Sequence, residues 1–510
     1  MEKSTKIKFN DIFKNLFSSY KYWIVYLILI LIAVFSMFNI ENYLHPKFEL
    51  IILFLVSIIS IFSIVFYYKH GKHELYKLTF IILLLFGLIC AFTVPIDSVS
   101  DEYEHFTRAE ITSRGILFPD YVNGNYESIS SLTNFYLNSP DKTVFQVDGD
   151  TQKINTSSSY YDSAFEQNPF YGYIFSAIGI GIAKLLDLNV IWMLWLGRIF
   201  NVIMYAGLVS LAIKKTPIFK IQLFALSCLP VCLFQAFSLS IDSFIAGLGI
   251  FAVAYFFNMS VNKFDRKDII VFSISCLLIG LCKLPYLAMI FLILFIPQDN
   301  FKEKKYYLYC ILSILIVSIM GLLWNNLVAT PALYHSWRNT YFIQNNVSVS
   351  NQINYIFLHP YDFIIEVLHL FNSIPYIFGG FFTFYSYTIE GGQYIASTFI
   401  SFLLTLFVAF ISIYPENTKI NLKSRIGTLI VFIIIYVGTF IVQLLSWSPV
   451  GQLVLYGALP RYFLVLFALL PFIFSKYIAN YKNQELDRYT IVLVLFFISS
   501  MLISFAAKYY

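Results

Sequence analysis

Long apolar runs recur from Tyr22 to the C-terminus, and they limit what this chain can fold into more than any other feature. A helix of about 20 mainly apolar residues crosses the hydrocarbon core of a bilayer. Hydrophobic residues occupy 59% of the 510 positions and charged residues only 12%, roughly half the charged share of a soluble domain. Because apolar runs continue along the chain, we do not expect the first to be a cleaved signal peptide. The sequence therefore predicts an all-α integral membrane protein with many spans.

Clusters of basic residues indicate which ends of these spans lie in the cytoplasm, because lysine and arginine are enriched in cytoplasmic turns. Five lysines lie within residues 3–21, so the N-terminus is predicted to be cytoplasmic. Residues 170–186 are apolar but short, and we interpret them as an interfacial or re-entrant helix instead of a span. With that choice, the other basic turns also become cytoplasmic: 69–77, 214–220, 263–267 and 302–305.

This topology predicts a polytopic bundle of about thirteen transmembrane helices with one larger external loop. The expected spans are 22–40, 50–67, 78–96, 188–213, hairpins at 221–258 and 269–297, 306–327, 391–413, 425–446, 461–477 and 489–507. The chain then divides into five parts. These are 1–96 with the cytoplasmic N-terminus and three spans, 97–187 with the external loop and an acidic motif, 188–327 with spans and hairpins, 328–389 as a second external segment, and 390–510 with the last spans.

The densest group of ionisable residues follows the third expected span. Four carboxylates, an imidazole and a guanidinium lie between Asp97 and Arg108. If a helix begins after Ser100 as its N-cap, then Asp101, Glu104, His105 and Arg108 share one helix face. This density suits acid–base chemistry or a metal, although a solvated helix start with ordinary ion pairs would also explain it.

Other ionisable residues lie in or beside apolar spans, where a charge costs about 2.5 to 3.5 kcal/mol even on lenient scales. Arg198 lies about ten residues inside a span and needs an internal partner. Asp242 occupies an expected hairpin tip, where it is either functional or a helix cap. Lys283 precedes a helix-breaking proline, where it would meet an anionic group or snorkel to the interface. Arg461 lies at the outer boundary as a functional residue or as part of the interfacial belt.

The predicted topology brings Asp101, Glu102, Asp242, Lys283 and Arg461 to the same outer face, although they are far apart in sequence. Carboxylates beside cations suit a reaction that needs a base and releases a phosphate. The sequence contains no Gly-x-x-x-x-Gly-Lys-Ser/Thr loop, no His-Glu-x-x-His helix and no Gly-x-Ser-x-Gly elbow. ATP-driven pumping and zinc proteolysis are therefore disfavoured. The net charge of +5 does not indicate a nucleic-acid partner.

At these residues the chain resembles the bacterial membrane proteins grouped as domain of unknown function 2142, which are similar to GT-C glycosyltransferases. The motif Asp-Glu-x-x-His-Phe-x-Arg-Ala begins at Asp101. It is followed in order by Asn168-Pro169-Phe170-Tyr171, Leu196-Gly197-Arg198, Ser240-Ile241-Asp242, Lys283-Leu284-Pro285-Tyr286 and Arg461-Tyr462-Phe463. Leu284 stands where a second proline is common, and Leu459-Pro460 replace a usual Gln-Gly. The two spans before the third are an addition to the usual single leading helix.

The resemblance implies transfer of a sugar from a polyprenyl-phosphate donor to an envelope glycan, teichoic acid or glycolipid outside the cytoplasm. Asp101 would be the catalytic base and Glu102 would assist it or bind a divalent cation, Mg²⁺ or Mn²⁺, together with Asp101. The cations Lys283, Arg198 and Arg461 would stabilise the departing phosphate. The remaining substrate-binding residues would be Glu104, His105, Arg108, Asp242, Tyr286 and Tyr462.

Two other functions stay open. A transporter or flippase of lipid-linked sugar would use Arg198 as a midplane contact and the acidic loop as a gate. A polysaccharide polymerase or ligase would also use external arginines, but would not need the pair Asp101 and Glu102. No two-fold internal repeat and no cluster of midplane carboxylates is evident in the sequence, which disfavours ion-coupled transport.

Overall fold

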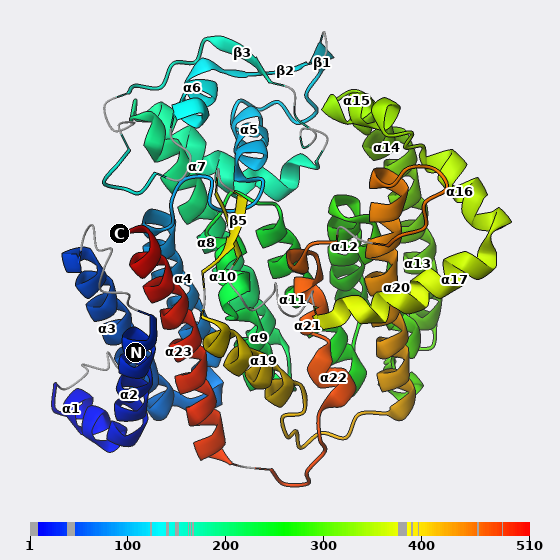
Figure 1. Cartoon of the computed structure of the whole chain (residues 1–510). Coiled ribbons are helices and arrows are strands. Elements are labelled where there is room, and N and C mark those ends of the chain that lie inside the picture. Colours follow the sequence, from blue (N-terminus) through cyan, green and yellow to red (C-terminus); the bar gives the residue numbers. More distant parts are fainter. Residues whose placement is uncertain are drawn as a thin grey trace.

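The structure is a computed structural model of the chain, and most of the residues are described. The described residues are 9–37, 46–122, 125–138, 142–147, 152–161, 163, 165, 168–375, 385–388, 391–395, 397–455, 458–481 and 483–510. Long helices run roughly side by side, with a smaller layer of short elements across one end (Figure 1). The end of the first expected span, 38–40, and part of the second external segment, 376–384, lie outside the described residues.

The N-terminal half supplies the helices that surround the acidic motif. Its elements are α1 (Phe9–Ser18), α2 (Tyr20–Met37), α3 (Pro46–His70), η1 (Gly71–Glu74), α4 (Leu75–Thr93), α5 (Glu102–Ser113), β1 (Tyr121–Val122), β2 (Asn125–Ile129), α6 (Ser130–Asn138), β3 (Ser158–Tyr161), η3 (Phe170–Tyr173), α7 (Ile174–Leu185), α8 (Val190–Lys215), α9 (Lys220–Ser227), α10 (Pro230–Ala236) and α11 (Asp242–Val261). The strands β1, β2 and β3 form one antiparallel sheet in that order.

The C-terminal half contains more broken helices. Its elements are α12 (Arg266–Cys282), η4 (Leu284–Phe295), η5 (Gln298–Asn300), α13 (Lys305–Trp324), η6 (Asn325–Ala329), α14 (Thr330–Leu333), α15 (Trp337–Gln344), α16 (Val349–Leu358), α17 (Pro360–His369), η7 (Leu370–Ser373), the antiparallel pair β4 (Tyr385–Thr388) and β5 (Gly391–Tyr394), α19 (Thr398–Ser412), α20 (Leu422–Trp447), η8 (Pro460–Phe463), α21 (Leu464–Phe467), α22 (Leu470–Phe474) and α23 (Gln484–Tyr509).

The prediction of an all-α membrane protein is confirmed, whereas the count of about thirteen spans is not. Six stretches of the described chain are long and apolar enough to cross a membrane: 47–93, 190–215, 242–261, 305–333, 422–447 and 484–509. The first contains α3 and α4, separated by a turn at Gly71, whose φ of +61° suits glycine. Shorter apolar helices occupy Tyr20–Phe35, Phe170–Leu185, Leu284–Phe295 and Thr398–Ser412.

Prolines break two of the expected span-length helices. The segment expected to begin the 221–258 hairpin is divided into α9 and α10, and Pro230 starts the second piece. The expected span 461–477 is divided into η8, α21 and α22, with Pro460 and Pro471 at the starts of two pieces. A proline lacks the N–H that continues a helix and clashes with the preceding turn.

The basic turns gather at one end of the molecule. Lys215 pairs with Asp268 at 2.6 Å, which joins the end of α8 to the start of α12. Lys72, between α3 and α4, pairs with Asp487 at 3.1 Å near the start of α23. Asp242 begins α11, and its 20 residues rise about 30 Å before the helix ends beside these turns. Asp242 is therefore separated from the basic turns by the length of a helix.

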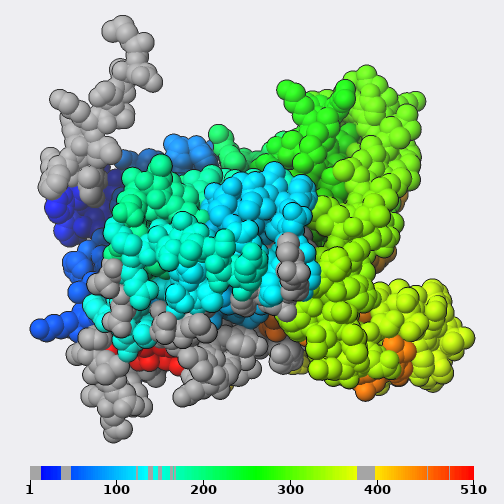
Figure 2. All heavy atoms as spheres, turned by 90° about the horizontal axis from the view of Figure 1, so that it is seen from above, coloured from blue at the N-terminus to red at the C-terminus, as the bar shows by residue number. Residues whose placement is uncertain are grey.

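The helix α7, which comes from the ambiguous segment 170–186, packs against α8 and α5 in the layer that contains the small sheet (Figure 1). Gly179 allows this close approach, because a Cβ there would overlap the carbonyl of Leu196 on α8. The elements α5, α6, α7 and β1–β3, with the described residues that connect them, lie at the end of the molecule away from the basic turns and are called the outer cap below. Figure 2 looks down on this cap, shown in cyan and teal, beside the green to yellow-green helices α14–α17, which we call the lateral lobe.

Candidate functional site

The acidic motif begins at a sharp backbone turn between α4 and α5. Asp101 has φ +62° and ψ +18°, the left-handed conformation, and α5 starts at the next residue, Glu102. The prediction that Ser100 caps a helix beginning at Asp101 is therefore wrong by one residue. Asp and Asn adopt this conformation more readily than other residues with side chains. The turn sends the side chains of Asp101 and Glu102 to different surroundings.

Glu102 forms a sealed ion pair with Arg198 of α8, and both side chains are completely buried. Arg198 Nε donates to Glu102 Oε1 at 2.8 Å, and Nη2 donates to Oε2 at 2.5 Å. The remaining Arg198 donors reach the carbonyls of Ala91, Val94 and Pro95 at 2.8 to 3.1 Å. The predicted internal partner of Arg198 is thus Glu102. We call Glu102 and Arg198 the sealed pair.

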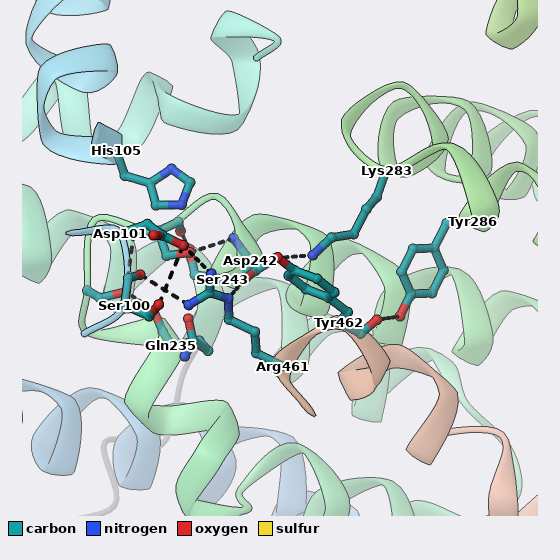
Figure 3. Close-up of polar contacts among 12 residues, drawn as sticks. Ser100, Asp101, His105, Gln235, Asp242, Ser243, Lys283, Tyr286, Arg461 and Tyr462 are labelled. Carbon is teal, nitrogen blue, oxygen red and sulfur yellow. Dashed lines mark hydrogen bonds and ion pairs between the residues drawn. The ribbon is translucent and has the colours of Figure 1, made fainter. Parts of the chain in front are cut away.

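Asp101, which precedes Glu102 in the chain, belongs to a row of four charged side chains of alternating sign (Figure 3). Arg461 forms an ion pair with Asp101, and its Nη1 donates to the Ser100 carbonyl at 3.2 Å. On its other side, Arg461 Nε lies 3.1 Å from Asp242 Oδ2. Lys283 Nζ donates to Asp242 Oδ1 at 2.7 Å. We call Asp101, Arg461, Asp242 and Lys283 the open row, because Asp101 and Lys283 at its two ends are 38% and 21% exposed.

Each member of the open row lies at an interruption of regular helix. Asp242 begins α11, Lys283 separates α12 from η4, and Arg461 lies in the short helix η8. Tyr286 donates a 2.6 Å hydrogen bond to the Tyr462 carbonyl, which fastens η4 to η8. The Lys283 ammonium lies 3.7 Å from the centre of the Tyr462 ring, a favourable cation–π position. These helix ends therefore bring the four side chains of the open row together.

The other polar residues of the motif hold the outer cap in place. Arg108 is buried and donates to the Asn168 and Leu117 carbonyls at 3.1 and 2.8 Å, while Glu104 accepts a hydrogen bond from Ser163. His105 lies beside Asp101 (Figure 3), and its Nδ1 is 2.7 Å from the Tyr173 hydroxyl.

Burial lowers the pKa of the His105 imidazole to about 4. This ring is therefore neutral at physiological pH. It can exchange a hydrogen bond with Tyr173 without adding another charge next to the open row.

The structure thus brings together five of the residues singled out in the sequence, Asp101, Asp242, Lys283, Arg461 and Tyr462, with Tyr286 behind them. It places Glu102 and Arg198 in the sealed pair, and Glu104 and Arg108 in contacts within the outer cap. Both oxygens of Glu102 already accept from Arg198, so Glu102 does not fit as a ligand for a divalent cation shared with Asp101. A requirement for Mg²⁺ or Mn²⁺ stays a prediction.

Sequence reasoning missed Arg338, which is the second residue of α15 and follows Trp337. This residue is only 6% exposed and lines a cavity of about 290 Å³ together with Lys283 and Tyr462. The signal in the sequence was an arginine between aromatic residues just after the apolar run that ends near 327. In an external segment this pattern is typical of ordinary interfacial residues, so it did not stand out.

Comparison with known proteins adds a family to this geometry. A family model described as "Predicted membrane protein (DUF2142)" matches residues 84–470, which include every member of the open row and the sealed pair. The helices α1, α2 and α3 lie outside the matched range. No curated protein and no solved structure matches the chain. Because the match covers most of its length, this chain belongs to the DUF2142 family of predicted membrane proteins.

Proposed function

We propose that this protein is a membrane glycosyltransferase that moves a sugar from a polyprenyl-phosphate donor to an envelope glycan, teichoic acid or glycolipid. The observation that carries the proposal is the open row. A partly exposed carboxylate, Asp101, is held by Arg461 near the Lys283 ammonium at one end of a helical membrane protein. A reaction that takes a proton from an alcohol and releases an anionic phosphate needs these two kinds of group.

In this proposal, Asp101 accepts the proton of the acceptor hydroxyl as its oxygen attacks the anomeric carbon of the donor sugar. The bond between that carbon and the phosphate oxygen breaks in the same step, and its electron pair leaves with the lipid phosphate. A single displacement of this kind inverts the configuration at the anomeric carbon. The proton then passes from Asp101 to water, which restores the carboxylate.

Lys283 is the member of the open row best suited to receive the leaving phosphate. Its ammonium has three donors, of which one is used by Asp242, and its side chain is 21% exposed. Arg461 is only 8% exposed and contacts Ser100, Asp101 and Asp242. We therefore assign Arg461 the task of positioning the Asp101 carboxylate, with a smaller share in stabilising the phosphate than the sequence suggested.

The sealed pair is a structural support for the same site. Arg198 links Glu102 to the end of α4 through three backbone carbonyls, and Glu102 also accepts from the Leu239 amide at 3.3 Å. These contacts join the end of α4, the start of α5 and the segment before α11, and Asp101 directly precedes Glu102 in the chain. We infer that Glu102 and Arg198 position the base without contacting the substrate.

The proposed orientation places the N-terminus in the cytoplasm and the open row at the extracytoplasmic face of the cell membrane. The basic turns meet at the end opposite to the open row, which supports this assignment through the positive-inside rule. The sugar and the acceptor are then found outside the cytoplasm, where a nucleotide-activated sugar is not the expected donor. A lipid-linked donor suits this location.

The test is a transfer assay with purified protein in liposomes, a radiolabelled polyprenyl-phosphate sugar and an envelope extract as acceptor. Asp101→Asn should lower the rate of sugar transfer by about 10² to 10⁴-fold, the usual contribution of a general base. The matched control is Glu127→Gln, which changes a carboxylate of the outer cap that is 49% exposed and lies in β2. That control should keep the wild-type rate.

Full transfer by a stably inserted Asp101→Asn protein would show that Asp101 is not the base. Movement of labelled lipid-linked sugar across the liposome membrane without any transfer would instead establish the transporter function. Chelation of divalent cations in the same assay decides the metal question, because a metal-dependent enzyme loses transfer and regains it when Mg²⁺ or Mn²⁺ is restored.

A further inference from the structure

A cavity of about 290 Å³ lies next to the open row, between the outer cap, η4, α20 and the lateral lobe. Its size is close to the lower limit for small-molecule sites, about 300 Å³. Phe165, Asn168 and Pro169 line it from the outer cap, while Lys283 and Tyr462 line it from the site already described. The rings of Tyr121 and His335 stack at 5.6 Å and connect the outer cap to the lateral lobe.

Arg338 of α15 is the second basic side chain in the wall of this cavity, and its surroundings are unusual. Its Nη2 donates to the Ser446 carbonyl at 2.6 Å, and its guanidinium lies 3.5 Å from the centre of the Trp447 ring. Its Nε is buried and makes no hydrogen bond. Within the described part of the chain, Arg338 forms no ion pair with a carboxylate.

A buried guanidinium without an anionic partner is costly, because the charge has lost its water. Burial lowers the pKa of the Arg338 side chain to about 10, which still leaves it positively charged at neutral pH. The Trp447 ring offsets part of the cost through a cation–π contact. A buried donor without a partner asks for an explanation, and an acceptor in the adjoining cavity, which Arg338 lines, would satisfy this guanidinium.

We propose that this cavity binds the phosphate head of a polyprenyl phosphate, with Arg338 on one side of the phosphate and Lys283 on the other. Arginine and lysine are the residues that bind phosphate most strongly, arginine through its fixed fork of donors. The proposal deepens the proposed function and rests on it for the identity of the lipid. It adds the cation that sequence reasoning missed.

The walls of the cavity suit a lipid better than a free ion. Leu281, Leu284, Pro285, Leu333 and Val442 supply an apolar lining. One wall of the cavity is formed by residues of the stretch 305–333, whose membrane-length window is only 17% buried and is therefore largely open to surrounding lipid. A π-helical turn, η6, interrupts this stretch at Asn325–Ala329, and both of its end residues line the cavity. Such turns are frequent at functional sites.

This arrangement explains how a lipid in the bilayer reaches the open row. The phosphate would lie between Arg338 and Lys283, with the chain passing along α13 into the membrane. The Lys283 ammonium over the Tyr462 ring is shared by the cavity and the open row, so a sugar on this phosphate would face Asp101 and Asp242.

The experiment measures binding of fluorescent polyprenyl monophosphate to the full-length protein in nanodiscs of neutral lipid, with no acceptor present. Arg338→Gln should weaken this binding by about tenfold or more, as expected for the loss of a charge-assisted contact. Arg488→Gln is the matched control, because Arg488 lies 4.3 Å from the Tyr68 ring on α3, beside the basic turns. That control should change the affinity by less than about twofold.

Competition distinguishes the sources of the phosphate. Phosphatidylglycerol and inorganic phosphate should each compete poorly. Equal competition by phosphatidylglycerol would assign the cavity to an ordinary phospholipid, and equal competition by inorganic phosphate would assign it to a free anion; either result overturns the proposal. Unchanged binding by a folded Arg338→Gln protein overturns it as well.

A second measurement uses the wild-type protein and so does not depend on how a variant folds. A polyprenyl phosphate with a photoreactive group near its head should label residues of α13, α14 and α20 around the cavity, and labelling confined to other helices contradicts the proposal. Asp101→Asn should bind the lipid normally. Normal binding without any transfer by the wild-type protein would refute the proposed function alone, whereas transfer that is indifferent to Arg338→Gln would refute the lipid site alone.

Discussion

Asp101 and Glu102 are neighbours in the sequence with the same functional group, yet their surroundings in the molecule are opposite. Glu102 is completely buried and both of its oxygens are bound by Arg198. Asp101 is 38% exposed and shares Arg461 with Asp242 in the open row. A carboxylate that is fully satisfied can hold structure, whereas one that is open to solvent can also accept a proton from a substrate. Two adjacent residues therefore have different proposed roles: Glu102 positions the site, and Asp101 is the base.

The sealed pair should make the largest contribution to stability. Glu102→Ala leaves the Arg198 guanidinium buried without its counter-charge, and this should lower the free energy of unfolding by about 3 to 5 kcal/mol. Glu102→Gln, which keeps an acceptor for Arg198, should cost less. Unfolding in mixed detergent and SDS micelles measures both values, with Glu127→Ala as an exposed control. Equal effects of Glu102→Ala and this control would mean that the pair is not a structural anchor.

Acid should lower the free energy of unfolding through His105, which lies in the outer cap. The folded-state pKa of this imidazole is lowered by burial to about 4, while an unfolded histidine titrates near 6.5. The unfolded chain therefore binds the proton first, and stability should fall by about 3 kcal/mol as the pH drops from 6.5 to 4. His105→Asn, which can still bond to Tyr173, should show a shallower fall. Unfolding curves across this pH range for both proteins check the difference.

The open row should affect activity more than stability. Lys283→Gln removes the proposed phosphate contact but leaves Arg461 beside Asp242. The value of kcat/KM for sugar transfer should fall by about 10 to 100-fold, as for a lost hydrogen bond to a charged group. Lys283→Arg should restore part of the rate. A Lys283→Gln protein with normal kcat/KM would place the phosphate elsewhere.

The smallest effect is expected for the stability of Asp101→Asn. Asp101 is 38% exposed and Arg461 keeps Asp242 as a partner, so losing this ion pair should cost only about 1 kcal/mol, and asparagine also tolerates the left-handed backbone at this position. The variant should therefore unfold within about 1 kcal/mol of the wild type even though its transfer should fall by about 10² to 10⁴-fold. A loss of stability as large as that of Glu102→Ala would remove the distinction between the two carboxylates.

The sequence predicted the membrane class and the proximity of residues that are far apart in the chain. It predicted the number of spans and the local geometry of the site less well. The alternation of basic turns and apolar runs in the sequence was enough to predict that Asp101, Asp242, Lys283 and Arg461 lie at one end. The structure joins these four residues through ion pairs. The requirement that Arg198 find an internal partner was also correct. These predictions succeeded because burying an unpaired charge or inverting a span is costly, whatever the local geometry.

Local geometry could not be obtained from spacing alone. The left-handed turn at Asp101 shifts the start of α5 by one residue, and spacing did not predict that Glu102 would be the partner of Arg198. The breaks at Pro230 and Pro471 shorten helices that hydropathy extends into full spans. Arg338 was missed because its importance depends on an unpaired Nε and a cavity, which only the packed side chains reveal.

The backbone at residue 101 also narrows what can replace it during evolution. A left-handed φ of +62° is tolerated routinely only by glycine, asparagine and aspartate. Glycine has no side chain for proton transfer, and the amide of asparagine is not a base. If a carboxylate is needed here, aspartate is the residue that best combines this chain conformation with the chemistry. A lineage that keeps this turn and this activity therefore has few replacements at the position, and glutamate would add the cost of a left-handed backbone.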